Sequence, residues 1–211
     1  ELAARDPSPV VRLYLAAGLQ RIPLGNRWDI ATNLLAHAED ADDHNLPLMY
    51  WYGVEALADE NPKRAIQLAL KSKVSLIAKF MWRRLAMGES GGLEALCQAL
   101  AMLEVGFIDA MLTELDTVID KRPNLVMPEA WPRAVKRLLA IPALRDRAAN
   151  ISLAFGDLSL APFMLQVLVG QDNNHQERGK ALQGLMRVHD PELATILHTL
   201  LAEVPLRMAA L

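Results

Sequence analysis

Apolar residues recur at intervals of three and four along the whole chain, in runs of helical length separated by short polar segments. This spacing places apolar side chains on one face of an α-helix, whereas a half-buried strand would alternate at every second residue. The interruptions are rich in Pro, Gly, Asn and Asp, which favour turns and helix ends. The pattern therefore predicts about a dozen helices of ten to sixteen residues, joined by short turns.

The first third of the chain gives the most detailed prediction. A helix is expected from Pro9 to about residue 21, with Ser8 as its cap and the proline in its first turn. A second helix is expected over residues 27–37. A third is expected over residues 46–58, after an acidic turn.

The third of these helices is apolar on nearly every side. Leu46, Tyr50, Val54 and Leu57 fall on one stripe, and Trp51 lies on another face. A helix that is apolar all round is normally packed between neighbours. Core packing is therefore favoured for these aromatic side chains over a platform for sugar or haem.

Four of the predicted helices share a local pattern, an arginine followed three or four residues later by an alanine. The pairs are Arg12 and Ala16, Arg145 and Ala148, Arg178 and Ala181, and Arg207 and Ala210. The last three arginines are separated by 33 and 29 residues, a period typical of stacked helix pairs. The alanines would let neighbouring helices approach, and each arginine would bond a turn or a carboxylate of the adjacent repeat. The middle of the chain shows the pattern poorly.

This pattern resembles the HEAT repeat, in which the second helix begins with Asp or Pro and carries Val-Arg followed by Ala. The expected fold is all-α, a right-handed α-α superhelix similar to HEAT and armadillo solenoids, with about six helix pairs. We expect it to form a single domain over residues 1–211.

A narrower resemblance lies in "ARDPSPVVRLYLAAGLQRIPLGNRW" and "LLAHAEDADDHNLPLMYWYGVEALA". Both stretches are similar to the helical middle region of the PVC-type haem-binding proteins, also described as membrane-bound dehydrogenases. In that family a dehydrogenase-like β-propeller precedes the repeats and a c-type cytochrome domain with Cys-x-x-Cys-His follows them. The resemblance implies an exported or periplasmic bacterial protein of which this chain is a piece. Because the chain has one cysteine, Cys97, and no Cys-x-x-Cys-His, haem c would belong to other parts of the parent protein.

Composition narrows the function further. The 211 residues are 52% hydrophobic, which is enough to bury a sizeable core. The sequence contains no run of about eighteen apolar residues, so it predicts no membrane span. A net charge of −3 gives no electrostatic reason to expect a nucleic-acid partner. The single cysteine excludes an internal disulfide, and its apolar surroundings predict a buried thiol.

The stretch "AHAEDADDHNLPLMYWYG" holds the densest group of ionisable residues, and Asp40, Asp42, Asp43 and His44 are its candidate metal ligands. A calcium loop counted from Asp40 would need glycine at its sixth position, where Asn45 stands. Zinc would need further His or Cys ligands at helical or hairpin spacing. A turn is the favoured interpretation, in which Asp42, Asp43 or Asn45 caps the incoming helix.

The remaining histidines show no catalytic spacing: His175, His189 and His198 are scattered, with no nucleophile at a recognisable distance. The leading hypothesis is a non-catalytic helical-repeat scaffold that binds proteins or neighbouring domains, without a cofactor in this segment. The alternative is a helical-repeat protein that binds nucleic acid or acts like a DNA glycosylase. That use needs a basic concave face, which the net charge opposes.

Overall fold

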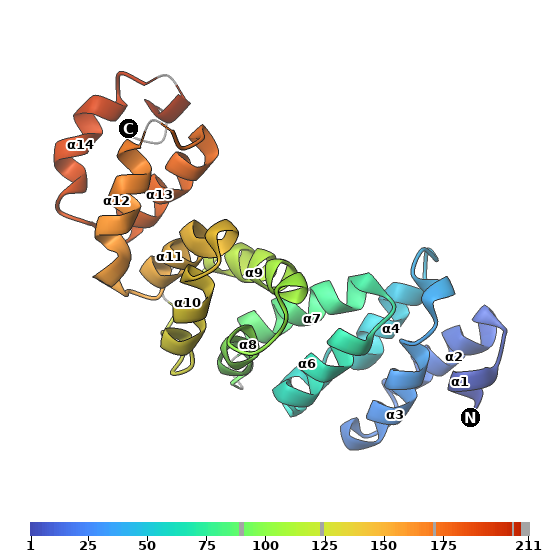
Figure 1. Ribbon diagram of the computed structural model, residues 1–211. Coiled ribbons are helices and arrows are strands. Elements are labelled where there is room, and N and C mark those ends of the chain that lie inside the picture. The colour runs from blue at the N-terminus through green and yellow to red at the C-terminus, as the bar shows by residue number, and fades with distance from the viewer. Residues whose placement is uncertain (89–90, 123–124, 171, 204, 208–211) are drawn as a thin grey trace. The chain divides into compact units, whose positions relative to one another are not determined.

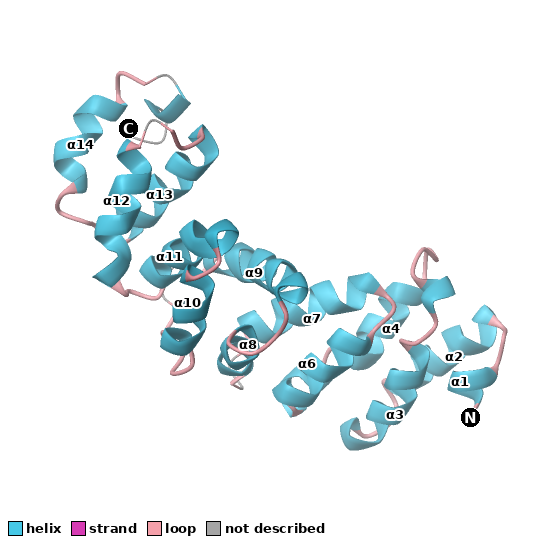
Figure 2. Ribbon diagram, in the orientation of Figure 1, coloured by secondary structure: helices cyan, strands magenta, loops and turns pink. Residues whose placement is uncertain are grey.

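The computed structural model describes residues 1–88, 91–122, 125–170, 172–203 and 205–207, and these residues form helices and turns without a strand (Figures 1 and 2). The predicted all-α class is confirmed. The chain divides into two compact units, unit 1 (Glu1–Val118) and unit 2 (Ile119–Leu211). The expectation of one repeat domain over residues 1–211 stays a prediction.

Unit 1 contains nine α-helices and one 3₁₀ helix within its described residues. They are α1 (Leu2–Arg5), α2 (Pro9–Leu19), α3 (Leu24–Leu34), η1 (Ala38–Asp40), α4 (Leu46–Val54), α5 (Leu57–Glu60), α6 (Pro62–Lys71), α7 (Ser75–Met87), α8 (Gly92–Leu100) and α9 (Val105–Ile119), the last of which ends one residue beyond the unit. Each of the helices from α2 to α8 packs against helices that are near it in the sequence, such as α2 against α3 and α4.

Unit 2 is built in the same manner from helices of similar length. Its described elements are α10 (Trp131–Leu139), η2 (Pro142–Leu144), α11 (Arg145–Ala154), η3 (Leu158–Leu160), α12 (Ala161–Val169), α13 (His175–Arg187) and α14 (Leu193–Leu200). Helix α13 packs against both α11 and α12. The core between them is mostly aliphatic and includes Leu153, Met164, Leu168, Leu182 and Leu185.

Local sequence signals explain where many helices begin. The Ser8 hydroxyl accepts the amide of Val11, and the Asn61 side chain accepts the amide of Arg64, as helix caps do. Asn174 and Glu177 form a reciprocal capping box at the start of α13. Proline occupies one of the first two positions of α2, α4, α6, α10 and α12, where its missing N–H costs no helical hydrogen bond.

Helices α2 and α4 approach closely in unit 1. A side chain on Gly53 of α4 would lie 2.7 Å from Cδ1 of Leu19 and 3.4 Å from the carbonyl oxygen of Ala16, both on α2. The predicted apolar stripe beginning at Leu46 and Tyr50 is buried in this contact region. Trp51 turns instead toward α7, where its ring meets Phe80 edge-on at 5.4 Å. Core packing is therefore confirmed for the stripe that contains Tyr50, whereas Tyr52 is 48% exposed.

Two predicted boundaries are wrong. The second helix begins at Leu24 and ends at Leu34, because Pro23 starts it and the chain after it turns into the loop that carries Asp40. The third predicted helix is divided into α4 and α5. Arg27 donates a hydrogen bond of 3.1 Å to the carbonyl of Gly53, which in a continuous helix would accept the amide of Leu57.

Candidate functional site

The N-terminal arginine cluster consists of Arg12, Asp40 and Tyr50. Arg12 donates from Nε to Oδ2 of Asp40 and from Nη2 to Oδ1, both at 2.6 Å, which makes a bidentate ion pair. The Tyr50 hydroxyl donates to Oδ2 of the same carboxylate, also at 2.6 Å. The Arg12 and Asp40 side chains are only 2% and 3% exposed, so this pair lies inside unit 1.

Three different elements bring the cluster together. Arg12 is the fourth residue of α2, Asp40 ends η1, and Tyr50 is in the middle of α4. Arg12 also donates from Nη1 to the carbonyl of Asp6, the residue that follows α1, at 3.1 Å. The cluster therefore fixes the ends of α1 and η1 against the α2–α4 contact.

The electrostatics follow from burial and these bonds. Burial alone would raise the pKa of Asp40, but the hydrogen bonds from Arg12 and Tyr50 and the charge of Arg12 outweigh it and lower that pKa. The hydrogen bond to Asp40 raises the pKa of Arg12. Burial, followed by the bond to Asp40, raises the pKa of Tyr50. Arg12 and Asp40 are therefore charged and Tyr50 is neutral at neutral pH.

This arrangement suits structural support better than catalysis. Both oxygens of Asp40 accept bonds within the cluster and its charge is paired with Arg12, so protonation of the carboxylate would break the ion pair. A buried carboxylate that works as a general base would instead need a raised pKa.

The other residues of the acidic turn have separate roles. Oδ1 of Asp43 accepts the amides of Asn45 at 2.8 Å and of Leu46 at 2.9 Å, which confirms the capping interpretation and assigns it to Asp43. Asp42 and His44 are exposed in the same loop. Among the described residues, no group of three or more His, Cys, Asp or Glu is arranged to hold a metal ion.

A second buried arginine lies in unit 2, where the C-terminal arginine pair consists of Arg178 and Glu203. Arg178 donates to both carboxylate oxygens at 2.6 and 2.8 Å, and its Nε donates to the carbonyl of Leu168 at 2.7 Å. The Arg178 side chain is 3% exposed, whereas that of Glu203 is 28% exposed. The hydrogen bonds from Arg178 lower the pKa of Glu203.

The two other arginines of the sequence pattern are exposed. Arg145 donates from Nε to the carbonyl of Leu139 at 3.1 Å, and Arg207 donates from Nε to the carbonyl of Leu201 at 2.8 Å. Arg145 opens α11, whereas Arg12 and Arg178 lie a full turn inside their helices. This position explains why the side chain of Arg145 stays at the surface.

The alanines of the pattern are buried where the structure describes them. Ala16, Ala148 and Ala181 have no exposed surface. Ala210 lies outside the described residues. The close approach of α2 and α4 at Ala16 is the contact that a small residue allows.

A fifth arginine of this kind, Arg27, is not among the four pairs of the sequence analysis. Arg27 donates to the carbonyls of Ile22 at 2.8 Å and Gln20 at 3.2 Å, which follow α2, as well as to that of Gly53. It fits the arginine–alanine spacing, because the buried Ala31 follows it by four residues. Arg12, Arg27 and Arg178 also share a second signal, since each stands four residues after the N-cap of its helix.

The chain has one cysteine, Cys97. It is fully buried in α8, as predicted, and burial raises the pKa of its thiol. A neutral thiol in an apolar environment is a poor nucleophile. Cys97 is therefore a core residue.

None of the described helices combines the length and the apolar character that crossing a lipid bilayer requires. Comparisons of the chain with protein-family models, with characterised proteins and with solved structures find no match.

Proposed function

We propose that this chain is a non-catalytic helical-repeat scaffold that binds or joins protein domains. In this proposal its helices form a right-handed superhelix of about six helix pairs, similar to HEAT and armadillo solenoids. Such repeats stack because one helix pair cannot bury its apolar face alone, and stacking leaves extended surfaces for partners.

A repeated arginine contact carries this proposal. Five arginines each donate a hydrogen bond to a main-chain carbonyl at or just beyond the end of the preceding helix; they are Arg12, Arg27, Arg145, Arg178 and Arg207. The last carbonyls of a helix lack partners within it, and arginine side chains satisfy them. The same arginine–carbonyl contact occurs in both units, as expected of a chain built from related helix pairs.

The spacing of the acidic partners gives the same support. Asp40 follows Arg12 by 28 residues, and Glu203 follows Arg178 by 25 residues. Helix-pair repeats are about 33–47 residues long, so each carboxylate lies less than one repeat beyond its arginine. An arginine in one repeat would thus pair with a carboxylate at the beginning of the next connection.

The family resemblance extends the proposal to a parent protein. There the repeats would connect a propeller-type dehydrogenase domain to a c-type cytochrome domain outside the cytoplasm. Haem and redox chemistry would belong to those domains, and this segment would contact both domains and set their relative position.

The test uses the purified 211-residue chain. It should take up no stoichiometric haem or metal, and it should show no turnover of sugars with an artificial electron acceptor. Reproducible turnover that survives further purification would refute the proposal. A positive control is the same assay with a sugar dehydrogenase of known activity.

A further inference from the structure

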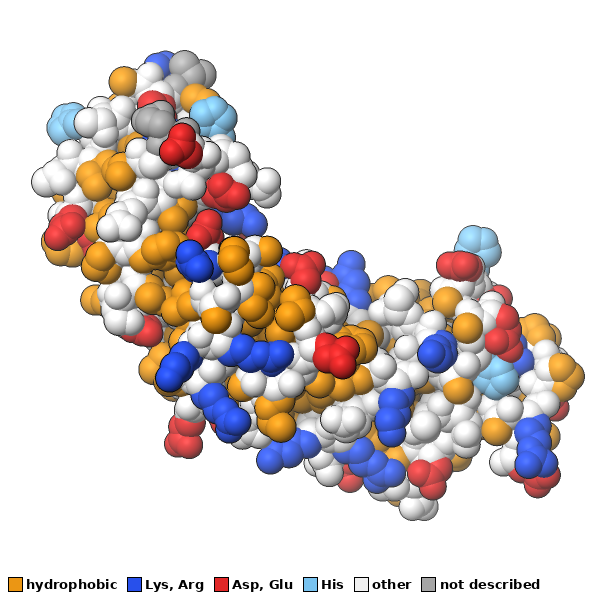
Figure 3. Space-filling view, viewed as in Figure 1, with side chains coloured by type: hydrophobic (Ala, Val, Ile, Leu, Met, Phe, Trp, Pro, Cys, Tyr) orange, Lys and Arg blue, Asp and Glu red, His pale blue; other side chains and the backbone are white. Residues whose placement is uncertain are grey.

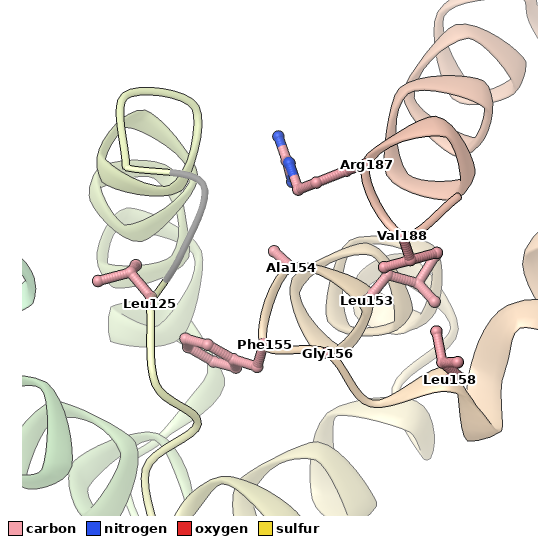
Figure 4. Close-up of a pocket in the computed structure, with 8 residues that line it drawn as sticks. All are labelled: Leu125, Leu153, Ala154, Phe155, Gly156, Leu158, Arg187 and Val188. Carbon is pink, nitrogen blue, oxygen red and sulfur yellow. The ribbon is translucent and has the colours of Figure 1, made fainter. Parts of the chain in front are cut away.

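Unit 2 has a cavity that its own side chains leave unfilled. It has a volume of about 420 Å³ and is lined by Leu125, Leu153, Ala154, Phe155, Gly156, Leu158, Arg187 and Val188 (Figure 4). Pockets that bind ligands or side chains of partners commonly have volumes of 300–1,000 Å³ and mostly apolar walls with a few polar groups. Here Arg187 is the one charged residue of the lining.

One large apolar side chain of the cavity lining is exposed to solvent. Leu158 lines it and is 54% exposed. Val126 and Met186 are also exposed, and each is next in the chain to a lining residue. A surface that leaves large apolar groups in water beside a cavity is typical of an interaction site.

Arg187 gives the cavity a charge preference. It reaches from α13 above Ala154, while Leu125 and Phe155 lie on the other side (Figure 4). Among the described residues, Arg187 has one hydrogen-bond partner, Oδ1 of Asp120, at 3.4 Å. The Asp120 side chain is 71% exposed. Charge-assisted bonds are normally 2.7–2.9 Å long, so a better placed carboxylate could compete for this guanidinium.

The charge of unit 2 as a whole also favours an acidic partner. Unit 2 contains eleven Lys or Arg and nine Asp or Glu, although the whole chain is acidic. Trp131, the first residue of α10, meets Phe155 of the cavity edge-on at 5.2 Å. Arg133 and Lys136 of α10 are exposed, and basic side chains gather over α10 on the face seen in Figure 3. An acidic partner would be attracted to unit 2 as a whole.

We propose that this cavity is a docking site for an acidic segment of a partner protein, which inserts an apolar side chain between Leu125, Phe155 and Leu158 and pairs a carboxylate with Arg187. This inference rests on the proposed scaffold function and names the partner chemistry for one of its surfaces. The exposed Leu158 leaves the cavity open to solvent on one side, which a peptide segment could cover.

The test measures binding of a fluorescein-labelled peptide of alternating leucine and glutamate to the full chain by fluorescence anisotropy. Saturable binding that weakens with added salt is expected. A serine–glutamate peptide and a leucine–lysine peptide should bind at least about tenfold more weakly, because each lacks one of the two required chemistries. Equal binding of either control peptide would overturn the proposal.

Matched variants locate the binding. Leu158→Glu should lower affinity about tenfold or more, and Arg187→Gln about threefold to tenfold. Val169→Glu makes the same kind of change at an exposed apolar residue of unit 2 outside the cavity lining, and it should leave the affinity unchanged. Circular dichroism would establish that all three variants fold. Equal losses in Leu158→Glu and Val169→Glu would contradict the assignment.

Other occupants give different results. Binding of dodecanoate without binding of the leucine–glutamate peptide would indicate a small amphiphile and overturn the proposal. Self-association of the chain that Leu158→Glu abolishes would indicate a second copy and would also overturn it. Neither result produces catalytic turnover, so failure of this site is distinguishable from failure of the scaffold function.

Discussion

The two buried arginines occupy the same place in their helices but different environments. Arg12 and Arg178 are each the fourth residue of a helix, and each forms a bidentate pair with a carboxylate that follows by 25 to 28 residues. In the N-terminal arginine cluster both partners are buried, and Tyr50 adds a third bond. In the C-terminal arginine pair Glu203 remains partly in contact with solvent.

This difference teaches that two arginines at the same position of a helix can differ in energetic consequence, because their carboxylate partners are buried to different depths. A buried charge left without its partner keeps its full desolvation cost, while a partly exposed one recovers hydration. Loss of one partner should therefore affect unit 1 more than unit 2.

The largest expected effect is that of Asp40→Asn. It leaves Arg12 charged and buried without its carboxylate, which should lower the free energy of unfolding of unit 1 by about 3–5 kcal/mol. Hydrogen exchange of α2 and α4, read by mass spectrometry, measures this loss separately from unit 2. Asp42→Asn, at an exposed residue of the same loop, should change it by less than about 0.5 kcal/mol. Similar values for the two variants would refute the structural importance of the cluster.

Acid should abolish the same stabilisation. The pKa of Asp40 is lowered on folding, so its stabilising contribution is complete above the unfolded value of about 3.9 and is lost as the pH falls through the folded value. The difference in free energy of unfolding between the wild type and Asp40→Asn should be constant from about pH 7 to pH 5 and shrink below about pH 4. Urea titrations at a series of pH values test this, and a difference that persists unchanged into strong acid would contradict it.

The equivalent change in unit 2 is Glu203→Gln. Because Glu203 is partly exposed and Arg178 keeps its bond to the Leu168 carbonyl, the expected loss is about 1–2 kcal/mol. It should appear in the exchange of α12 and α13. Glu192→Gln, at an exposed residue just before α14, is the matched control. A loss as large as that of Asp40→Asn would remove the distinction between the two environments.

The smallest effect should come from Tyr50→Phe. It removes one of the three bonds to Asp40 but leaves the ion pair intact, so the expected loss is about 1 kcal/mol. Tyr52→Phe, two residues further along α4 at an exposed position, should be neutral. Equal stability of the two variants would show that the hydroxyl of Tyr50 contributes nothing to the cluster.

Much of the fold could be predicted from the sequence because it depends on local signals. Apolar spacing gave the helical class, and Ser8, Asp43 and the early prolines marked helix starts. The split between α4 and α5 could not be predicted, and the Gly53 carbonyl at that point bonds Arg27, which is 26 residues away in the sequence.

The candidate site was only partly predictable for the same reason. The sequence singled out Asp40 within an acidic stretch, but its pairing with Arg12 and Tyr50 requires three elements to meet in space. The arginine–alanine pattern found Arg12 and Arg178, yet it treated Arg145 as equivalent although it opens its helix. Position relative to the N-cap distinguishes these arginines, and that position is known only once the helix boundaries are known.

The most direct test of a folding role for the N-terminal arginine cluster is the free energy of unfolding of the triple variant Arg12→Met, Asp40→Leu and Tyr50→Phe. Apolar groups of similar size can replace a buried ion pair with little loss, so the triple variant should lie within about 2 kcal/mol of the wild type and well above Asp40→Asn. It should also bind the leucine–glutamate peptide as the wild type does. A folded triple variant that no longer binds the peptide, or one no more stable than Asp40→Asn, would contradict the account.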